Sequence, residues 1–460
     1  MSAVAVFDIG KTNVKLTVAD PDGRLLETLS VTNPVSPGPP YPHHDLDRLE
    51  DWFVAGLAEL ATRHDIEAVV ATGHGSGGVL VGEDGPAMPM IDYEQAIPPS
   101  VEVRYRSEVG PFRDRGSPVM LGAAHLARQM LWLETGWPDA FAAARHFLAL
   151  PQYWSWRLSG VAASEVTSLG AQSHLWSAAD GRPTRLAVDR GWARLLPPVM
   201  SAWTTLGPLR PEMVQRTGLG RKVRVINGIH DSSASFYRHQ VAGLADFVLV
   251  STGTWVVALG DDPRADFDHE RPGFCCNADA FGRPVPCVLT MGGREFGAVA
   301  GGRSGLASAE ALAGIVASNT RALPAFGDDD GLFPGRARSG FVEGPLSQDD
   351  HHRLSLAVLY AALLTDRCLA GIAGATVVLD GPFVRDPLFG ALVAALNRGR
   401  RVLINREQYG TATGCALLAF HERRKGAALL SLQPPPPLEF PGLLAYRDAW
   451  LELATSRRLP

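Results

Sequence analysis

AVFDIGKTNVKLTVADPDG, residues 5–23, is the stretch that decides the fold. Its Gly10-Lys11-Thr12 looks like the end of a Walker phosphate loop, G-x-x-x-x-G-K-[ST], which lies between a strand and a helix. Ala5 stands where that motif requires its first glycine, and VKLTVAD after the turn alternates apolar and polar residues as a half-buried strand does. The stretch therefore predicts two antiparallel strands joined by a tight turn, which excludes the Walker loop.

A second stretch, ADFVLVSTGTWVVALGDDP at residues 245–263, repeats this pattern about one domain length later. Both copies place a turn rich in glycine and hydroxyl side chains between two apolar strands. Successive backbone N–H groups in such a turn form a concave anion site. The repeat predicts an α/β protein of two related domains, residues 1–242 and 243–460, which face each other over a central cleft and clamp ATP between their hairpins.

The two hairpins supply the predicted phosphate contacts. A glycine lets a phosphate approach the backbone, a lysine adds charge, and threonine and asparagine add side-chain donors. Asp8, just before the first turn, is predicted to hold Mg²⁺ through water. For the first hairpin alone, an ordinary turn with a surface lysine is the alternative. The predicted ATP contacts are Gly10, Lys11, Thr12, Asn13, Ser251, Thr252, Gly253 and Thr254.

Composition and charge limit the class of protein. Of the 460 residues, 46% are hydrophobic and 20% charged, as in a soluble globular enzyme, and the net charge of -5 gives no reason to expect nucleic acid or an anionic membrane as partner. No basic segment precedes the first apolar strand, so we expect no signal peptide. The five cysteines form no C-x-x-C pair, so we expect a cytoplasmic protein with reduced thiols.

The remaining segments predict the elements between and after the hairpins. Residues 24–31 predict a third strand and residues 46–64 a helix, and His43-His44 in the proline-rich loop between them is expected at the surface rather than in a metal site. Residues 117–158 look largely helical. The second half predicts a helix at 354–373, a strand at 376–380, a helix at 410–424 and, after the linker QPPPP, a short final helix.

Six segments in this order resemble the FGGY carbohydrate kinases over nearly the whole chain. DIGKTN and VSTGTW are similar to the two phosphate motifs of that family, and GIHDSSAS at 228–235 to its catalytic segment. The other three are ARHFLALPQYWSWRLSG at 144–160, VVLDGPFVRDPLF at 377–389 and GTATGCALLA at 410–419. The resemblance implies an actin-like (ribonuclease H-like) ATPase fold in both halves and an ATP- and Mg²⁺-dependent sugar kinase.

The resemblance also implies roles for single residues. Asp231 would be the catalytic base that accepts the proton of the attacking hydroxyl; read alone, its position predicts a helix N-cap, and both roles can coexist. His230 would touch the sugar or serve as a structural histidine. Gly381, Pro382 and Phe383 occupy the adenosine motif, where the family has three glycines, and this departure puts the nucleotide preference in question.

Two segments of the first half are the predicted sugar contacts. In VATGHGSGGVLVGEDG, residues 70–85, His74 and Ser76 stand at the glutamine and histidine positions of the xylulokinase pattern, with Gly75 between them. In MIDYEQ, Asp92, Tyr93 and Glu94 are the candidates, a solvated acidic turn being the alternative. With His230 and Asp231 these residues form the expected sugar site.

The substrate is expected to be a small ketose. The S-T-G-T-W hairpin and the H-D pair are similar to those of the rhamnulokinase and fuculokinase branch, which implies a deoxyketohexose, L-rhamnulose first and L-fuculose next. Other ketoses or polyols (L-ribulose, xylulose, glycerol, erythritol) stay open, as does a non-catalytic sugar-sensing protein of the same fold. The expected partners are the sugar and ATP, with room for a homodimer.

Overall fold

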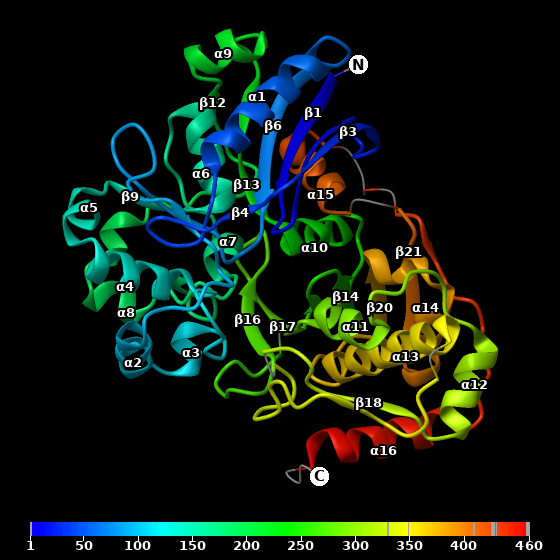
Figure 1. The fold of residues 1–460 in the computed structure, drawn as a ribbon. Coiled ribbons are helices and arrows are strands. Elements are labelled where there is room, and N and C mark those ends of the chain that lie inside the picture. Colours follow the sequence, from blue (N-terminus) through cyan, green and yellow to red (C-terminus); the bar gives the residue numbers. More distant parts are fainter. Residues whose placement is uncertain are drawn as a thin grey trace.

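Two mixed β-sheets with helices between and around them form the molecule, as Figure 1 shows. The computed structural model describes residues 2–262, 264–328, 331–347, 349–407, 410–424, 428 and 430–456. Within these residues, no helix is both long and apolar enough to cross a membrane. The five cysteines are buried.

The first sheet begins with the predicted three-strand meander. β1 pairs antiparallel with β2, β2 antiparallel with β3, and β1 parallel with β6, which pairs parallel with β13. β12 closes the sheet against β13. The strands, in sheet order, are β12 (Thr205–Pro208), β13 (Arg224–His230), β6 (Asp65–Gly73), β1 (Ser2–Ile9), β2 (Asn13–Ala19) and β3 (Leu25–Thr32).

The second sheet repeats this plan. β14 pairs antiparallel with β15 and parallel with β20, β20 parallel with β21, and a short antiparallel strand closes the sheet. Its extra edge strand is β16, next to β17. In sheet order the strands are β16 (Phe274–Ala278), β17 (Pro284–Thr290), β15 (Val256–Gly260), β14 (Phe247–Thr252), β20 (Thr376–Asp380), β21 (Arg401–Asn405) and β22 (Leu432–Gln433). The duplication inferred from the hairpins is confirmed.

Two helices lie between the sheets (Figure 1): α10 (Asp231–Val241) and α15 (Gly410–Ala419). Their side chains pack with Val4 and Val6 of β1, whereas Ala5 and Phe7 pack with α1 (Leu46–Ala61) and α6 (Leu150–Ser159) on the opposite face. Since side chains alternate along a strand, Asp8 falls on the face of Val4 and Val6. The strand period thus directs the Asp8 carboxylate toward the space between the sheets.

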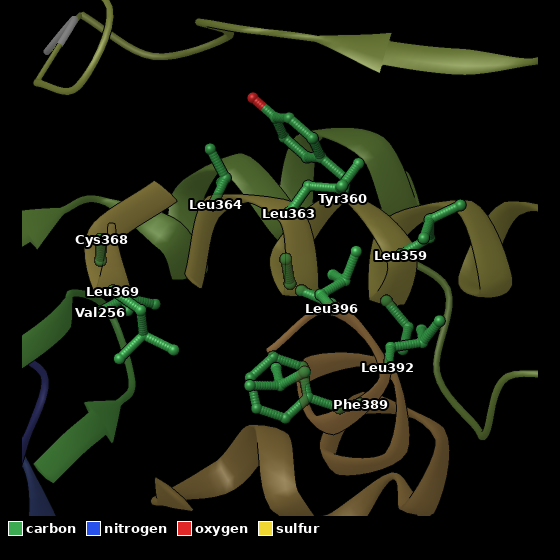
Figure 2. Packing of buried hydrophobic residues seen from close by; sticks show 14 of the residues in the cluster. Val256, Leu359, Tyr360, Leu363, Leu364, Cys368, Leu369, Phe389, Leu392 and Leu396 are labelled. Carbon is green, nitrogen blue, oxygen red and sulfur yellow. The ribbon is translucent and has the colours of Figure 1, made fainter. Parts of the chain in front are cut away.

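α13 (Asp350–Leu369) and α14 (Pro387–Leu396) cover the outer face of the second sheet. Figure 2 shows Phe389, Leu392 and Leu396 of α14 beneath α13, and Tyr360 on the other side of α13. The Tyr360 hydroxyl donates a hydrogen bond to Glu295 Oε2 over 2.5 Å. This packed layer supports the strands that carry the second hairpin.

Several boundaries and one placement need correction, and the helices expected at 46–64 and 410–424 end at Ala61 and Ala419. Residues 117–158 are largely helical, as expected, although the strand β9 (His146–Ala149) precedes α6. The helix expected at 354–373 begins at Asp350 and ends at Leu369, with Asp349 as its N-cap. His44 is 1% exposed rather than at the surface, because β5 (His43–His44) pairs with β8 (Met90–Ile91), which carries this residue inward.

The other elements are shorter or peripheral, apart from the final helix α16 (Leu443–Thr455), which confirms the prediction. The strands are β4 (Val35–Ser36), β7 (Gly78–Val81), β10 (Trp176–Ser177), β11 (Arg182–Pro183), β18 (Arg321–Leu323) and β19 (Phe341–Glu343). The helices are α2 (Pro99–Glu108), α3 (Phe112–Arg115), α4 (Leu126–Gly136), α5 (Pro138–Ala143), α7 (Val166–Gly170), α8 (Arg185–Asp189), η1 (Trp192–Leu195), α9 (Pro211–Thr217), α11 (Gly292–Ala300), α12 (Ala309–Ala317), η2 (Pro382–Arg385) and η3 (His421–Arg423).

Candidate active site

Two cavities adjoin between the sheets and share Ser251 and Thr252 of the second hairpin. The outer cavity, of about 390 Å³, is lined at the strand ends by Asp8, Lys15, Asp380, Gly381, Pro382 and Asn405, among others. The inner cavity, of about 280 Å³, is lined by both hairpins and by predicted sugar contacts: Gly10, Lys11, His74, Gly75, Ser76, Tyr93, His230, Asp231, Ser251, Thr252, Gly253 and Thr254. The second hairpin therefore joins the two spaces.

Asp8 lies in the wall of the outer cavity. Lys15 stands directly opposite it in the β1–β2 pairing. Burial raises the pKa of Asp8 to about 6; the positive charge of Lys15 partly offsets this, and the carboxylate of Asp231 adds to it. Burial and the nearby Asp231 carboxylate both disfavour the charged form of Asp8. A cation that enters the site would therefore stabilise the Asp8 carboxylate.

The loop after β20 is clamped to the second hairpin. Thr252 Oγ1 donates to the carbonyl of Asp380 over 2.7 Å and accepts from the N–H of Phe383 over 3.2 Å. Gly381 has φ +94°, and a Cβ there would lie 2.1 Å from the Thr252 carbonyl oxygen. Only glycine combines this backbone angle with such a close approach, so Gly381 fixes the rim of the outer cavity.

Asp231 is the first residue of α10 and faces the inner cavity. Its Oδ1 accepts from the N–H of Ser232 over 2.5 Å and lies 3.2 Å from Nε2 of His230. Burial lowers the pKa of His230, and the negative charge of Asp231 only partly opposes this. A neutral His230 that donates from Nε2 to Asp231 accepts at Nδ1 from the Ser233 hydroxyl, 3.1 Å away. The carboxylate is thus oriented while 31% of its side chain stays exposed.

Asp231 is not the N-cap that its position predicts, because it is the first residue inside α10. The N-cap residue of α10 is His230, whose side chain makes no capping bond, and the Asp231 carboxylate satisfies one N–H of the first helical turn. A carboxylate at a helix N-terminus is favoured by the helix dipole. This placement does not remove Asp231 from the inner cavity.

The inner cavity contains a neutral histidine with unused hydrogen-bonding capacity. Both ring nitrogens of His74 are buried without a hydrogen-bond partner. Burial lowers the pKa of His74 to about 3. Its ring meets Tyr93 edge-on, with centroids 5.2 Å apart. One ring nitrogen can donate and the other accept, which suits a ligand hydroxyl.

Lys11 faces the inner cavity and pairs with acidic residues. Its ammonium forms an ion pair with Asp92 and lies 4.0 Å from Glu94 and 5.1 Å from the centroid of the Tyr93 ring. Glu94 also pairs with Arg294 over 3.0 Å. Asp92 and Glu94 therefore pair with Lys11 from outside the inner cavity, since neither of them lines it.

Three other predicted contacts lie away from both cavities. Thr12 and Asn13 are exposed at the tip of the first turn. The N–H of Gly10 is used within that turn, because it donates to the carbonyl of Asn13 over 3.1 Å. Phe383 packs against Phe296 and Phe389, with ring centroids 5.3 and 5.4 Å away. The proposed roles of these residues in binding ATP stay predictions.

Residues 3–237 match the N-terminal domain of the FGGY family of carbohydrate kinases, and residues 244–428 match the C-terminal domain of FGGY carbohydrate kinases. The chain belongs to the FGGY family. Its fold is the two-domain, actin-like ATPase architecture of that family. The position of the boundary between the two domains, at residues 242/243, stays a prediction.

Relatives of this FGGY chain include kinases for several sugars. An L-fuculokinase of Salmonella typhi is 22% identical over 288 residues, 60% of this chain and 61% of that protein, so the chain spans about three fifths of its length. A carbohydrate kinase from Novosphingobium aromaticivorans is 30% identical, with a TM-score of 0.82 over 98% of both chains. A xylulose kinase from Rhodospirillum rubrum, 20% identical, superposes with a TM-score of 0.79 over 98% of this chain and 97% of its own; at this identity it shows the fold alone.

Sequence reasoning missed several cavity residues of this FGGY protein. Lys15 is not among the predicted contacts, although the hairpin register places it opposite Asp8. Trp255 follows the second hairpin directly and could have been found by position. Gln172 and Asn277, which also line the inner cavity, come from segments that resemble no motif, and the fold alone brings them together.

A buried carboxylate also supports the segment that precedes Asp231. Glu165, the N-cap of α7, accepts from the hydroxyl of Thr167 over 2.6 Å and from two backbone N–H groups. Thr167 Oγ1 in turn accepts from the N–H of His230 over 3.1 Å. Burial raises the pKa of Glu165 to about 7. Glu165 therefore holds His230 in place through Thr167.

The stability of the protein should depend on pH through Glu165. Its pKa is raised in the folded state, so the unfolded chain loses this proton at a lower pH than the folded protein does. The free energy of unfolding should therefore fall as the pH rises from about 4.5 to about 7, by about 3 kcal/mol in total. We expect the free energy of unfolding, measured with urea from pH 5 to pH 8, to fall more steeply in the wild type than in Glu165→Gln. A pH-independent difference between the two proteins would contradict this assignment.

Proposed function

We propose that the protein is an ATP-dependent sugar kinase that transfers the γ-phosphate to a hydroxyl of a small ketose. The observation that carries the proposal is that Asp231, both glycine-rich hairpins and the unpartnered His74 line one cavity. Phosphoryl transfer needs little more than positioning, charge stabilisation and a carboxylate that accepts the proton of the attacking hydroxyl. We also propose the domain division at 242/243 and a cytoplasmic location.

In the proposed mechanism the sugar occupies the inner cavity and the nucleotide the outer one. Ser251 and Thr252, common to both, lie where the transferred phosphoryl group would pass. Asp231 accepts the proton of the sugar hydroxyl as its oxygen attacks the γ-phosphorus, and the bond to the leaving ADP oxygen breaks. His230 keeps the Asp231 carboxylate oriented toward the sugar.

The carboxylates fit Mg²⁺ bound mainly through water and phosphate oxygens. No group of three or more His, Cys, Asp or Glu side chains among the described residues is arranged as a ready-made metal site. Mg²⁺ commonly binds through one or two carboxylates plus substrate phosphates, and Asp8 is a buried carboxylate in the outer cavity. The ion would neutralise the charge that develops on the phosphate oxygens.

Gly381 and Pro382 are proposed to meet the adenosine. Both line the outer cavity, together with Val384, and Gly381 is held against the second hairpin. Phe383 packs into the neighbouring core, so a role beside adenine would be indirect. The substitution of two family glycines by proline and phenylalanine leaves a rigid rim on this cavity.

A deoxyketohexose, L-fuculose or L-rhamnulose, is the proposed substrate. The L-fuculokinase relative supports this class, and the structure adds an apolar wall: Met120, Val257 and Leu289 line the inner cavity beside its polar groups. A methyl group gains free energy against such a wall, whereas a hydroxyl there would lose its hydrogen bonds. Other ketoses and polyols are the alternative substrates. A homodimeric assembly stays a separate prediction.

A coupled ADP-release assay over ketoses and polyols tests the proposed function. The panel contains L-fuculose, L-rhamnulose, L-ribulose, xylulose, glycerol and erythritol, each with Mg-ATP. We expect sugar-stimulated turnover, with the highest kcat/KM for a deoxyketohexose. Sugar binding without turnover by any member would favour a sugar-sensing protein instead.

Lys15 should contribute to the binding of ATP, and Lys11 to the binding of the sugar. Lys15 lines the outer cavity opposite Asp8, whereas Lys11 lines the inner cavity beside Tyr93. We expect Lys15→Met to raise KM for ATP about 10-fold, a loss of about 1.4 kcal/mol, with little change in KM for the sugar. Lys11→Met is the matched variant and should show the reverse pattern in the same kinetic measurements. Equal effects on both substrates would argue against this separation.

A further inference from the structure

An amide pair joins the two halves of the chain inside the inner cavity. Gln172 follows α7 in the first half, and Asn277 belongs to β16, the edge strand of the second sheet. Gln172 Nε2 donates to Asn277 Oδ1 over 2.9 Å. Both side chains line the cavity that contains Asp231.

Asn277 has an unused donor. The residue is 1% exposed, and its Nδ2 is buried without a hydrogen-bond partner. A buried polar group without a partner lowers stability by roughly 1–3 kcal/mol, so such groups usually have a ligand or a role. Because Gln172 occupies Oδ1, the Nδ2 group is the part of the amide left to bind something in the cavity.

Gln172 has an uncommon backbone conformation. Its φ of +54° is in the left-handed region, which non-glycine residues seldom adopt, and its carbonyl accepts from Nδ1 of His125 over 2.7 Å. Backbone conformations of this kind concentrate at binding sites, where the surrounding structure maintains them. The strained backbone and the buried His125 together aim the Gln172 side chain at Asn277.

We propose that Asn277 donates from Nδ2 to a hydroxyl of the sugar and that Gln172 positions it, so the second half of the chain takes part in selecting the sugar. This inference rests on the proposed sugar-kinase function. A site that hydrogen-bonds a ligand hydroxyl discriminates against analogues that lack it, because the donor is then left buried and unpaired. Asn277 thereby determines specificity at one hydroxyl, and Gln172 acts through it.

Sugar binding in the absence of nucleotide tests the proposal. Trp255 lines the same cavity, so tryptophan fluorescence titrations with L-fuculose, L-rhamnulose, L-ribulose, xylulose and glycerol report binding directly. We expect Asn277→Ala to weaken the binding of the preferred sugar about 10- to 100-fold, and Gln172→Gly, which relieves the left-handed backbone, to weaken it without lowering the melting temperature. A deoxy analogue that lacks the contacted hydroxyl should bind wild type and Asn277→Ala equally.

Asn405→Ala is the matched control. Asn405 is also 1% exposed with a buried, unpartnered Nδ2, but it lines the outer cavity. We expect this variant to bind the sugar as the wild type does. If the wild type binds a sugar and Asn277→Ala binds it equally well, the inference is overturned and the sugar-kinase proposal stands. If the wild type binds no member of the panel, both are overturned.

Discussion

Replacement of Asp231 by asparagine should lower kcat for sugar phosphorylation about 10³-fold and leave ATP binding intact. General base catalysis contributes roughly 10²- to 10⁴-fold, and asparagine keeps the shape of the side chain without its capacity to accept a proton. The contacts of the first turn of α10 should survive, because the asparagine carbonyl oxygen still accepts from the N–H of Ser232. Steady-state kinetics and ATP titration of the same preparation separate the two effects.

Asp189→Asn is the control for this change. Asp189 is an exposed aspartate at the end of α8 and lines neither cavity. It should show wild-type kcat and the same affinity for ATP. Near-normal turnover in Asp231→Asn would contradict the assignment of Asp231 as the catalytic base. Loss of ATP binding in that variant would indicate a structural role at the start of α10.

The second large effect is expected at Gly381. An alanine there would place its Cβ 2.1 Å from the Thr252 carbonyl oxygen and would also strain a backbone with φ +94°. Because Thr252 holds both the Asp380 carbonyl and the Phe383 N–H, the clash should move the hairpin and the rim of the outer cavity together. We expect KM for ATP to rise at least about 10-fold and kcat to fall, as measured in the coupled assay.

Gly282→Ala separates the clash from the backbone strain. Gly282 has φ +81°, but a Cβ built there meets no atom within 4 Å, and the residue lines neither cavity. It should lose a similar amount of stability through strain and keep its kinetic constants within about 2-fold. A comparable loss of activity in both variants would show that global stability, rather than the nucleotide site, explains the effect at Gly381.

Local patterns were sufficient to predict the framework of the site. The period-two alternation after Lys11 identified a strand instead of a helix, and the same period along β1 places Asp8 on the face between the sheets. The Ser-Thr-Gly-Thr turn identified the second hairpin because its flanking strands are also apolar. Turn chemistry and strand period are properties of neighbouring residues, so they can be interpreted without the fold.

Contacts between distant segments could not be predicted in this way. His44 is buried because β5 pairs with β8, about 45 residues later in the chain, and nothing in the proline-rich loop indicates that pairing. The turn motif predicts Lys11 at the tip of the first hairpin but not its ion pairs with Asp92 and Glu94, which lie about 80 residues further along the chain. Its role as an ATP contact stays a prediction. Gln172 and Asn277 meet only because β16 passes α7.

The most direct test of the central claim is the product of the reaction with L-fuculose and Mg-ATP, followed by ³¹P NMR. The proposed function predicts a phosphomonoester resonance that grows in step with ADP and disappears in Asp231→Asn. ADP accompanied only by inorganic phosphate, at a rate that no ketose or polyol changes, would contradict the assignment of this cleft to phosphoryl transfer onto a sugar.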